Sequence, residues 1–327
     1  MPPTPAGAPA AEVLRLQRTA GNRAVAQMLA RNASGAPPIE DRTPIDDLAK
    51  KKDVAPLDRV KAYAKIAGTD ALGMDPAAVN DSPVRKVGVN LGVLPTQDDK
   101  VGAQAGFIDA QDRFSGGKPP DDAKGVAIVV NVRSARFLDE DYMVAGIRHE
   151  MVHARLMKLT LQQKSAWEQN PGGLTFSQFV DNRMKGGDGA LVKDRFFGGH
   201  MDETVAYAEG FLTAFSYAPL EQPQPGDRAW IAHLKGFGTE YQNARNNSGP
   251  IPKKLPPNVD ERNLAIRHGA NAAEAEAEKL VKEFCDKAGP AKRKNLADWM
   301  LFLDKAGGMY RPALAMIHKA ATGKAMP

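Results

Sequence analysis

The sequence is poor in several features, and each scarcity excludes a class of protein. Its single cysteine, Cys285, cannot form an intramolecular disulfide or a cysteine-based zinc cluster. No uninterrupted apolar run is long enough to cross a membrane. The first residues, MPPTPAGAPA, lack the basic and apolar segments of a classical secretion signal. We therefore expect a protein made in the cytoplasm, which leaves the cell, if at all, by another route than classical secretion.

Positive charge is in slight excess, but it is not gathered into a surface for nucleic acid. The chain has 44 Lys and Arg against 39 Asp and Glu, a net charge of +5. Small basic clusters, such as 50–52 and 292–294, have no aromatic residues among them, although base stacking would need these. We expect a solvated basic surface and no nucleic-acid partner.

Composition divides the chain into four segments. Residues 1–40 are rich in Pro and Ala at the start and predict a flexible segment with a short amphipathic helix. Residues 41–245 predict the main folded domain. Residues 246–258, NNSGPIPKKLPPN, are typical of a linker. Residues 259–327 predict a C-terminal helical region.

Hydrophobic periodicity predicts an α+β main domain, with a small mixed sheet followed by a largely helical remainder. Short apolar runs bounded by turn residues predict strands at 85–94, 105–110 and 125–132. Apolar residues at helical spacing predict helices at 56–67, 140–159, 161–169, 175–185, 202–217 and 226–245. Asp139 is the expected N-cap of the helix that begins at 140.

The run His149-Glu150-Met151-Val152-His153 lies inside the predicted helix 140–159. Residues four apart on a helix share a face, so the two imidazoles can reach one metal ion. Glu150 follows the first histidine and can act on a metal-activated water without being a ligand itself. The spacing therefore predicts a hydrolytic zinc site with His149 and His153 as ligands and Glu150 as general base.

The alternative is that these are ordinary histidines of a helix and that Glu150 is solvated. The chain has six histidines. Residue frequencies give an expectation of roughly half a per cent for this pattern to arise by chance in the chain. Three of the other four histidines, His233, His268 and His318, stand alone and are expected to be structural or exposed.

A catalytic zinc needs a third protein ligand, and the segment 198–215 offers candidates. His200, Asp202, Glu203 and Glu209 all lie in GGHMDETVAYAEGFLTAF. We favour Glu203, because it lies near the start of a predicted helix that can fold back across the first one. His200 is the main rival, with Asp202 and Glu209 behind it.

Tyr207 lies one helical turn after Glu203 and shares its face. Its hydroxyl group could donate a hydrogen bond to the oxyanion of the transition state. Ordinary packing, with the hydroxyl group at the rim of the cleft, explains the residue as well. We keep Tyr207 as a candidate catalytic residue with this alternative open.

HEMVH and the downstream ETVAY resemble the zincin metallopeptidases, specifically the gluzincin type. The resemblance implies a zincin-like fold, a bound Zn²⁺ held by His149, His153 and Glu203, and hydrolysis of a protein or peptide substrate with Glu150 as base. The glycine and third histidine of the metzincin extension are both leucines here. Two other functions stay open: zinc-dependent hydrolysis of a non-protein amide such as peptidoglycan, and a non-enzymatic structural or interaction role.

A second resemblance lies in residues 16–25, LQRTAGNRAV. This segment resembles one that recurs in bacterial proteins associated with extracellular contractile injection systems, many of which are toxins or effectors. The resemblance implies a delivered effector with an injection particle as a partner. A short amphipathic helix that packs on the folded body is an equally good explanation.

Overall fold

The computed structural model describes residues 42–73, 88–93, 102–116, 118–226, 228–251 and 260–327, with the backbone alone for 88–93. All of these belong to one compact unit, Ala36–Pro327. The predicted N-terminal helix and most of the predicted Pro-rich linker lie outside the described residues.

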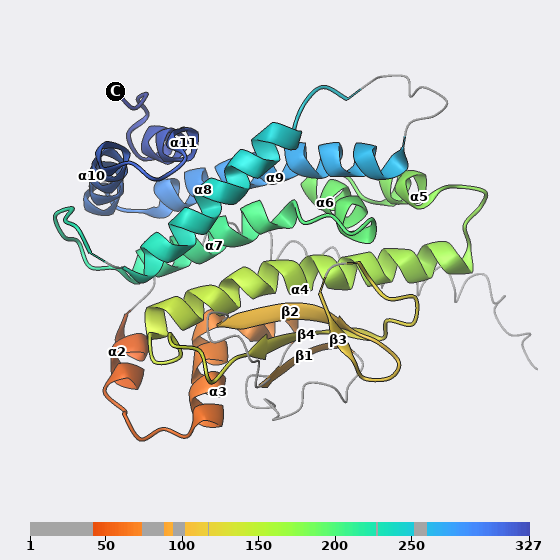
Figure 1. The fold of residues 1–327 in the computed structure, drawn as a ribbon, viewed down its shortest axis with the longest axis horizontal. Coiled ribbons are helices and arrows are strands. Elements are labelled where there is room, and N and C mark those ends of the chain that lie inside the picture. Colours follow the sequence, from red (N-terminus) through yellow and green to blue (C-terminus); the bar gives the residue numbers. More distant parts are fainter. Residues whose placement is uncertain (1–41, 74–87, 94–101, 117, 227, 252–259) are drawn as a thin grey trace, which may run out of the picture. The chain divides into compact units, whose positions relative to one another are not determined.

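A small mixed sheet precedes the helix that carries the histidine motif, as the sequence predicts (Figure 1). Its strands are β1 Gly88–Val93, β2 Ala103–Ile108, β3 Phe114–Ser115 and β4 Gly125–Val130, in the order β1-β4-β2-β3. Strand β4 is parallel to β1 and antiparallel to β2, which pairs with β3 in the antiparallel sense. Every residue of β4 is buried, as its apolar run GVAIVV predicts, and the strand lies between β1 and β2 in the sheet.

Helix α4, Glu140–Gln169, lies between the sheet and a layer of helices (Figure 1). The Asp139 side chain caps it by accepting a hydrogen bond from Tyr142 N at 3.1 Å. The sequence predicted two helices here, and that prediction was wrong, since the helix continues for 30 residues without a break. Thr160, at the expected break, is buried and donates its hydroxyl proton to Leu156 O at 2.8 Å, which keeps it within the helix.

The other described helices are α2 Thr43–Ala49, α3 Pro56–Ala67, the short 3₁₀ helix η1 Thr69–Leu72, α5 Phe176–Arg183, α6 Gly187–Phe196, α7 Asp202–Tyr217, α8 Ala229–Asn247, α9 Glu261–Lys287, α10 Pro290–Ala306 and α11 Arg311–Thr322. The α+β class is confirmed, and helix dominates. Helices α2 and α6 were not predicted. Within the described ranges, every helix is too short or too polar to span a bilayer.

Two hydrophobic cores lie on either side of α4. One joins the sheet with α2, α3 and α4, and the other joins α7 and α8 with the C-terminal helices α9 to α11. Aromatic contacts join the C-terminal helices to α8. The ring centroids of Trp230 in α8 and Trp299 in α10 are 4.9 Å apart, and the rings meet edge to face. The C-terminal helices therefore share a core with α7 and α8.

Helices α4 and α7 approach closely, and small residues permit this. Ala206 is fully buried in α7. One turn later, a Cβ atom at Gly210 would lie 3.3 Å from Ala145 O of α4 and 2.9 Å from the His233 ring of α8. This contact brings the first turn of α7 alongside the middle of α4, where the histidine motif lies.

Candidate metal centre

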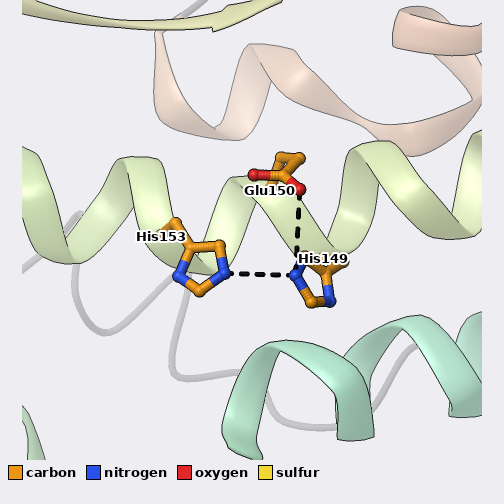
Figure 2. A group of neighbouring side chains, drawn as sticks. All are labelled: His149, Glu150 and His153. Atoms are coloured by element: carbon orange, nitrogen blue, oxygen red, sulfur yellow. Dashed lines mark hydrogen bonds and ion pairs between the residues drawn. The ribbon is translucent and has the colours of Figure 1, made fainter. Parts of the chain in front are cut away.

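The side chains of His149, Glu150 and His153 converge on one point beside α4 (Figure 2). Their residues are 7%, 9% and 4% exposed. The two imidazole rings have centroids 4.9 Å apart, and their Nε2 atoms lie 3.1 Å from each other. The helix therefore places two nitrogen donors and a carboxylate in a buried group that could hold a metal ion.

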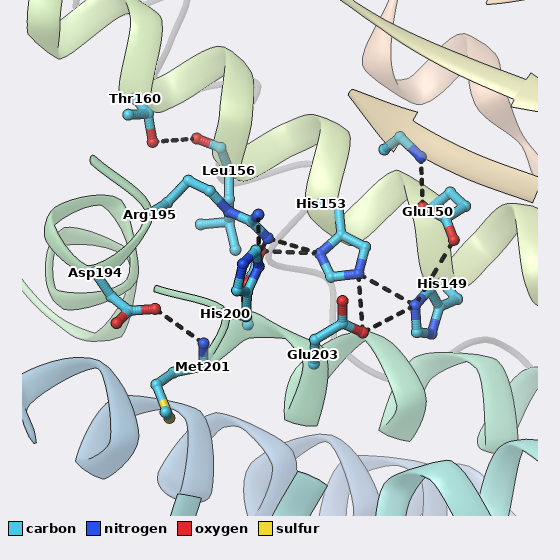
Figure 3. A network of polar contacts seen from close by, with 12 residues as sticks. His149, Glu150, His153, Leu156, Thr160, Asp194, Arg195, His200, Met201 and Glu203 are labelled. Carbon is cyan, nitrogen blue, oxygen red and sulfur yellow. Dashed lines mark hydrogen bonds and ion pairs between the residues drawn. The ribbon is translucent and has the colours of Figure 1, made fainter. Parts of the chain in front are cut away.

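Glu203, in the first turn of α7, reaches the same point from the other side (Figure 3). Its Oε2 atom lies 3.4 Å from His149 Nε2 and 3.3 Å from His153 Nε2. A tetrahedral ion with bonds of about 2.0–2.1 Å sets its ligand atoms roughly 3.3 Å apart. The two nitrogens and this oxygen thus have the separations of three corners of a zinc coordination tetrahedron.

Two of the other ligand candidates contact arginines instead. His200 is exposed, and its Nδ1 atom lies 3.3 Å from an Arg195 nitrogen. Glu209 Oε1 lies 3.7 Å from an Arg148 nitrogen. These contacts leave Glu203 as the carboxylate of α7 that faces both Nε2 atoms.

Asp202, the remaining candidate, joins His153 to a buried arginine. Its Oδ2 atom is 2.9 Å from His153 Nδ1, the ring nitrogen that faces away from Glu203, and it accepts a short hydrogen bond from Arg195. Burial raises the pKa of Asp202, but the charges of Arg195 and His153 outweigh it and hold that pKa well below its usual range. Burial lowers the pKa of His153, but Asp202 and Glu203 outweigh it and raise this pKa to about 10. Asp202 therefore stays ionised and fixes the His153 ring.

The loop between α6 and α7 is held by Asp194 and positions the first turn of α7 at the site. Asp194 Oδ2 accepts a hydrogen bond from Met201 N at 2.9 Å, and Asp194 O accepts one from Gly199 N at 2.8 Å. A Cβ atom at Gly199 would lie 1.9 Å from Asp194 Oδ1, so only glycine fits there. Asp194 and Arg195 were not predicted as part of the site, because α6 was not predicted. The adjacent glycines 198–199 were the available signal in the sequence.

Glu150 points toward the sheet as well as toward the histidines. Its Oε2 atom accepts a hydrogen bond from Ala105 N of β2 at 2.6 Å, and its Oε1 atom lies 3.7 Å from His149 Nε2. Burial raises the pKa of this carboxyl group, and the two histidines offset part of the rise. A base with a raised pKa is suited to take up and release a proton near neutral pH.

Two aromatic rings lie next to His149. The Tyr207 ring meets the His149 ring edge to face, with centroids 4.4 Å apart, and burial raises the Tyr207 pKa to about 12. His233 of α8 has its ring centroid 6.5 Å from that of His149. Burial lowers the His233 pKa to about 3, so this ring is neutral. From the sequence, His233 was expected to be structural or exposed, since no local pattern marks it as part of the site.

Comparisons of the chain with protein-family models, with curated proteins and with solved structures found no match. The residues and the geometry of the site therefore carry the functional argument. Chemically, the site offers two imidazole nitrogens, a carboxylate oxygen at the same point and a second carboxylate next to it.

Proposed function

We propose that the protein is a zinc-dependent metallopeptidase with a zincin-like active site. His149, His153 and Glu203 hold Zn²⁺ in this proposal. The observation that carries it is the triangle of donor atoms, with edges of 3.1, 3.3 and 3.4 Å. Helix spacing alone explains the closeness of the two histidines, but it does not bring a carboxylate from α7 to the same point.

The donor set fits zinc. Catalytic zinc sites have three protein ligands, drawn from His, Glu, Asp and Cys, and keep a fourth position open. Here two imidazole nitrogens and one carboxylate oxygen are supplied. Asp202 holds the outer edge of the His153 ring, as carboxylates do for metal-bound histidines.

The remaining side chains have distinct roles in the proposed reaction. Zinc, when bound, lowers the pKa of water to about 7 and polarises the carbonyl group under attack. Glu150 accepts the proton of the attacking water and delivers it to the leaving amine, while Ala105 N fixes the far oxygen of its carboxylate. The Tyr207 hydroxyl group donates a hydrogen bond to the substrate carbonyl oxygen as negative charge develops there.

The substrate we propose is a protein or peptide, and delivery as an effector or toxin by a contractile injection particle is part of the same proposal. The support for delivery comes only from residues 16–25, which lie outside the described residues. The support for peptide hydrolysis comes from the HEMVH run together with the position of Glu203.

Metal content and peptide cleavage, measured on one purified preparation, test the proposal. The wild-type protein should contain one zinc per chain and cleave a peptide library. Glu150→Gln should keep the zinc and the fold while cleavage is lost. Glu168→Gln, on the same helix and half exposed beside Lys164, is the matched control and should cleave normally.

Other outcomes contradict specific parts of the proposal. Zinc with cleavage of peptidoglycan and not of peptides would overturn the substrate. Cleavage that persists in Glu150→Gln would overturn the assigned base. A protein without zinc, whose stability a chelator leaves unchanged, would overturn the metal site itself and favour a non-enzymatic role.

A further inference from the structure

Two buried ring nitrogens near the site have no hydrogen-bond partner among the described residues. They are His149 Nδ1 and His233 Nε2. The two residues are 7% and 5% exposed, so bulk water does not satisfy these atoms. Leaving a buried polar atom unpaired destabilises the fold, and such atoms are rare in folded proteins.

The two nitrogens have complementary hydrogen-bonding roles. His149 Nε2 faces His153 and Glu203, so it is the nitrogen that would bind the metal ion. A nitrogen that binds metal carries no proton. The ring proton of His149 is therefore on Nδ1, which is a hydrogen-bond donor. His233 forms a hydrogen bond with the backbone of Tyr142. Since His233 Nε2 has no partner among the described residues, we assign this bond to Nδ1, which then donates to the Tyr142 carbonyl. His233 Nε2 is therefore an acceptor.

The separation of the rings rules out a direct hydrogen bond between them. Their centroids are 6.5 Å apart and a ring nitrogen lies about 1.1 Å from its centroid, so the two nitrogens are at least about 4 Å apart, beyond the roughly 3 Å of a direct hydrogen bond. Two hydrogen bonds through one water span up to about 5.6 Å between the outer atoms. A water that accepts from one ring and donates to the other would satisfy both nitrogens.

The surroundings of His233 hold the ring in place and leave room beside it. A Cβ atom at Gly210 would lie 2.9 Å from His233 Nδ1, so the absence of a side chain there lets the ring fit against α7. On α4, a Cβ atom at Gly146 would meet no atom of the described residues within 4 Å, apart from the backbone of its own helix. Gly146 lies one turn before His149, so the open position lies on the helix face that carries His149.

We propose that His233 is a positioning residue for the metal ligand His149 and acts through one bound water. The water accepts a hydrogen bond from His149 Nδ1 and donates one to His233 Nε2. This inference rests on the proposed zinc site. The two ligand histidines are then oriented differently: His153 by the carboxylate of Asp202 and His149 by a neutral imidazole across a water.

Zinc affinity, measured by competition with a chelator at fixed pH, tests this role. His233→Phe keeps a ring of similar size but has no hydrogen-bond acceptor. It should weaken zinc binding by about 10-fold, which is the low end of the affinity loss seen when a hydrogen-bond partner of a metal ligand is removed. His233→Gln restores an acceptor and should recover part of the loss. His318→Phe is the matched control, because His318 is 6% exposed and also has an unpaired ring nitrogen, but lies on α11.

The outcomes separate this inference from the proposed function. A wild-type protein that binds no zinc overturns both. Wild-type zinc binding with equal affinity in His233→Phe and His318→Phe overturns the role of His233 alone. If His233→Phe does not fold, nitrogen NMR of the zinc-loaded wild type decides: protons on His149 Nδ1 and His233 Nδ1 are expected, and a proton on His233 Nε2 in place of Nδ1 would overturn the inference.

Discussion

Asp202 and Glu203 contact opposite edges of the same imidazole ring. Asp202 Oδ2 lies 2.9 Å from His153 Nδ1, and Glu203 Oε2 lies 3.3 Å from His153 Nε2. Two consecutive residues at the start of α7 thus fix one residue of α4 from both sides. The position of His153 therefore depends on the loop that sets the start of α7.

Removing the charge of Asp202 should weaken metal binding. In Asp202→Asn, the His153 ring loses its ionised partner, and we expect zinc affinity to fall about 10- to 100-fold. Chelator competition measures the change. Asp188→Asn is the control, because Asp188 pairs with Arg155 of α4 at 2.7 Å without touching either histidine of the motif. Equal zinc affinity in the two variants would contradict the assigned role of Asp202.

The Tyr207 hydroxyl group can be tested apart from its ring. Tyr207→Phe keeps the edge-to-face contact with His149, whose ring centroid is 4.4 Å away. If the hydroxyl group donates to the transition state, kcat should fall by about 10²- to 10³-fold while zinc content stays unchanged. Steady-state kinetics on a cleaved peptide measures this. A kcat equal to that of the wild type would leave Tyr207 with a packing role.

Two glycines of α8 form a matched pair for the position of that ring. A Cβ atom at Gly236 would lie 2.2 Å from Tyr207 Cε1, whereas one at Gly238 would make an ordinary 3.7 Å contact with Tyr310. Both substitutions by alanine gain the same helix propensity. The difference between their unfolding free energies therefore measures the clash with the Tyr207 ring. We expect Gly236→Ala to be less stable than Gly238→Ala by about 1–3 kcal/mol in denaturant unfolding. Equal stabilities would show that Tyr207 moves freely.

The stability of the α7 loop should depend on pH through Asp194. Burial raises the pKa of Asp194 from 3.8 to about 7. The folded chain thus binds this proton more tightly than the unfolded chain, and ionisation destabilises the fold as pH rises from about 4 to about 7. Asp194→Asn cannot ionise and should show a smaller loss of unfolding free energy across this range, in zinc-free buffer. A pH dependence identical to that of the wild type would contradict the raised pKa.

The elements that carry the motif were predictable because their signals are local. Asp139 as N-cap and apolar residues at helical spacing indicate α4, and the predicted helix at 202–217 coincides with α7. Helix α6 was not predicted because its sequence, GDGALVKDRF, begins with glycines and carries several charges. Its place in the fold comes from contacts with α4 and α9, which no local pattern reveals.

The candidate site was predictable only in part, for the same reason. His149, Glu150 and His153 lie within five positions of each other, so helix geometry alone groups them. The contact of Asp202 with His153 joins residues 49 positions apart, and it depends on how α7 packs on α4. The choice of Glu203 as the third ligand was a hypothesis from its place in the sequence and from the resemblance. In the structure, its carboxylate lies next to both histidines.

The most direct test of the central claim is a crystal structure of the zinc-loaded protein with anomalous data at the zinc edge. We predict one anomalous peak about 2.0–2.2 Å from His149 Nε2, His153 Nε2 and a Glu203 carboxylate oxygen. A map from crystals grown with equimolar zinc that shows no peak among these three atoms would contradict the account.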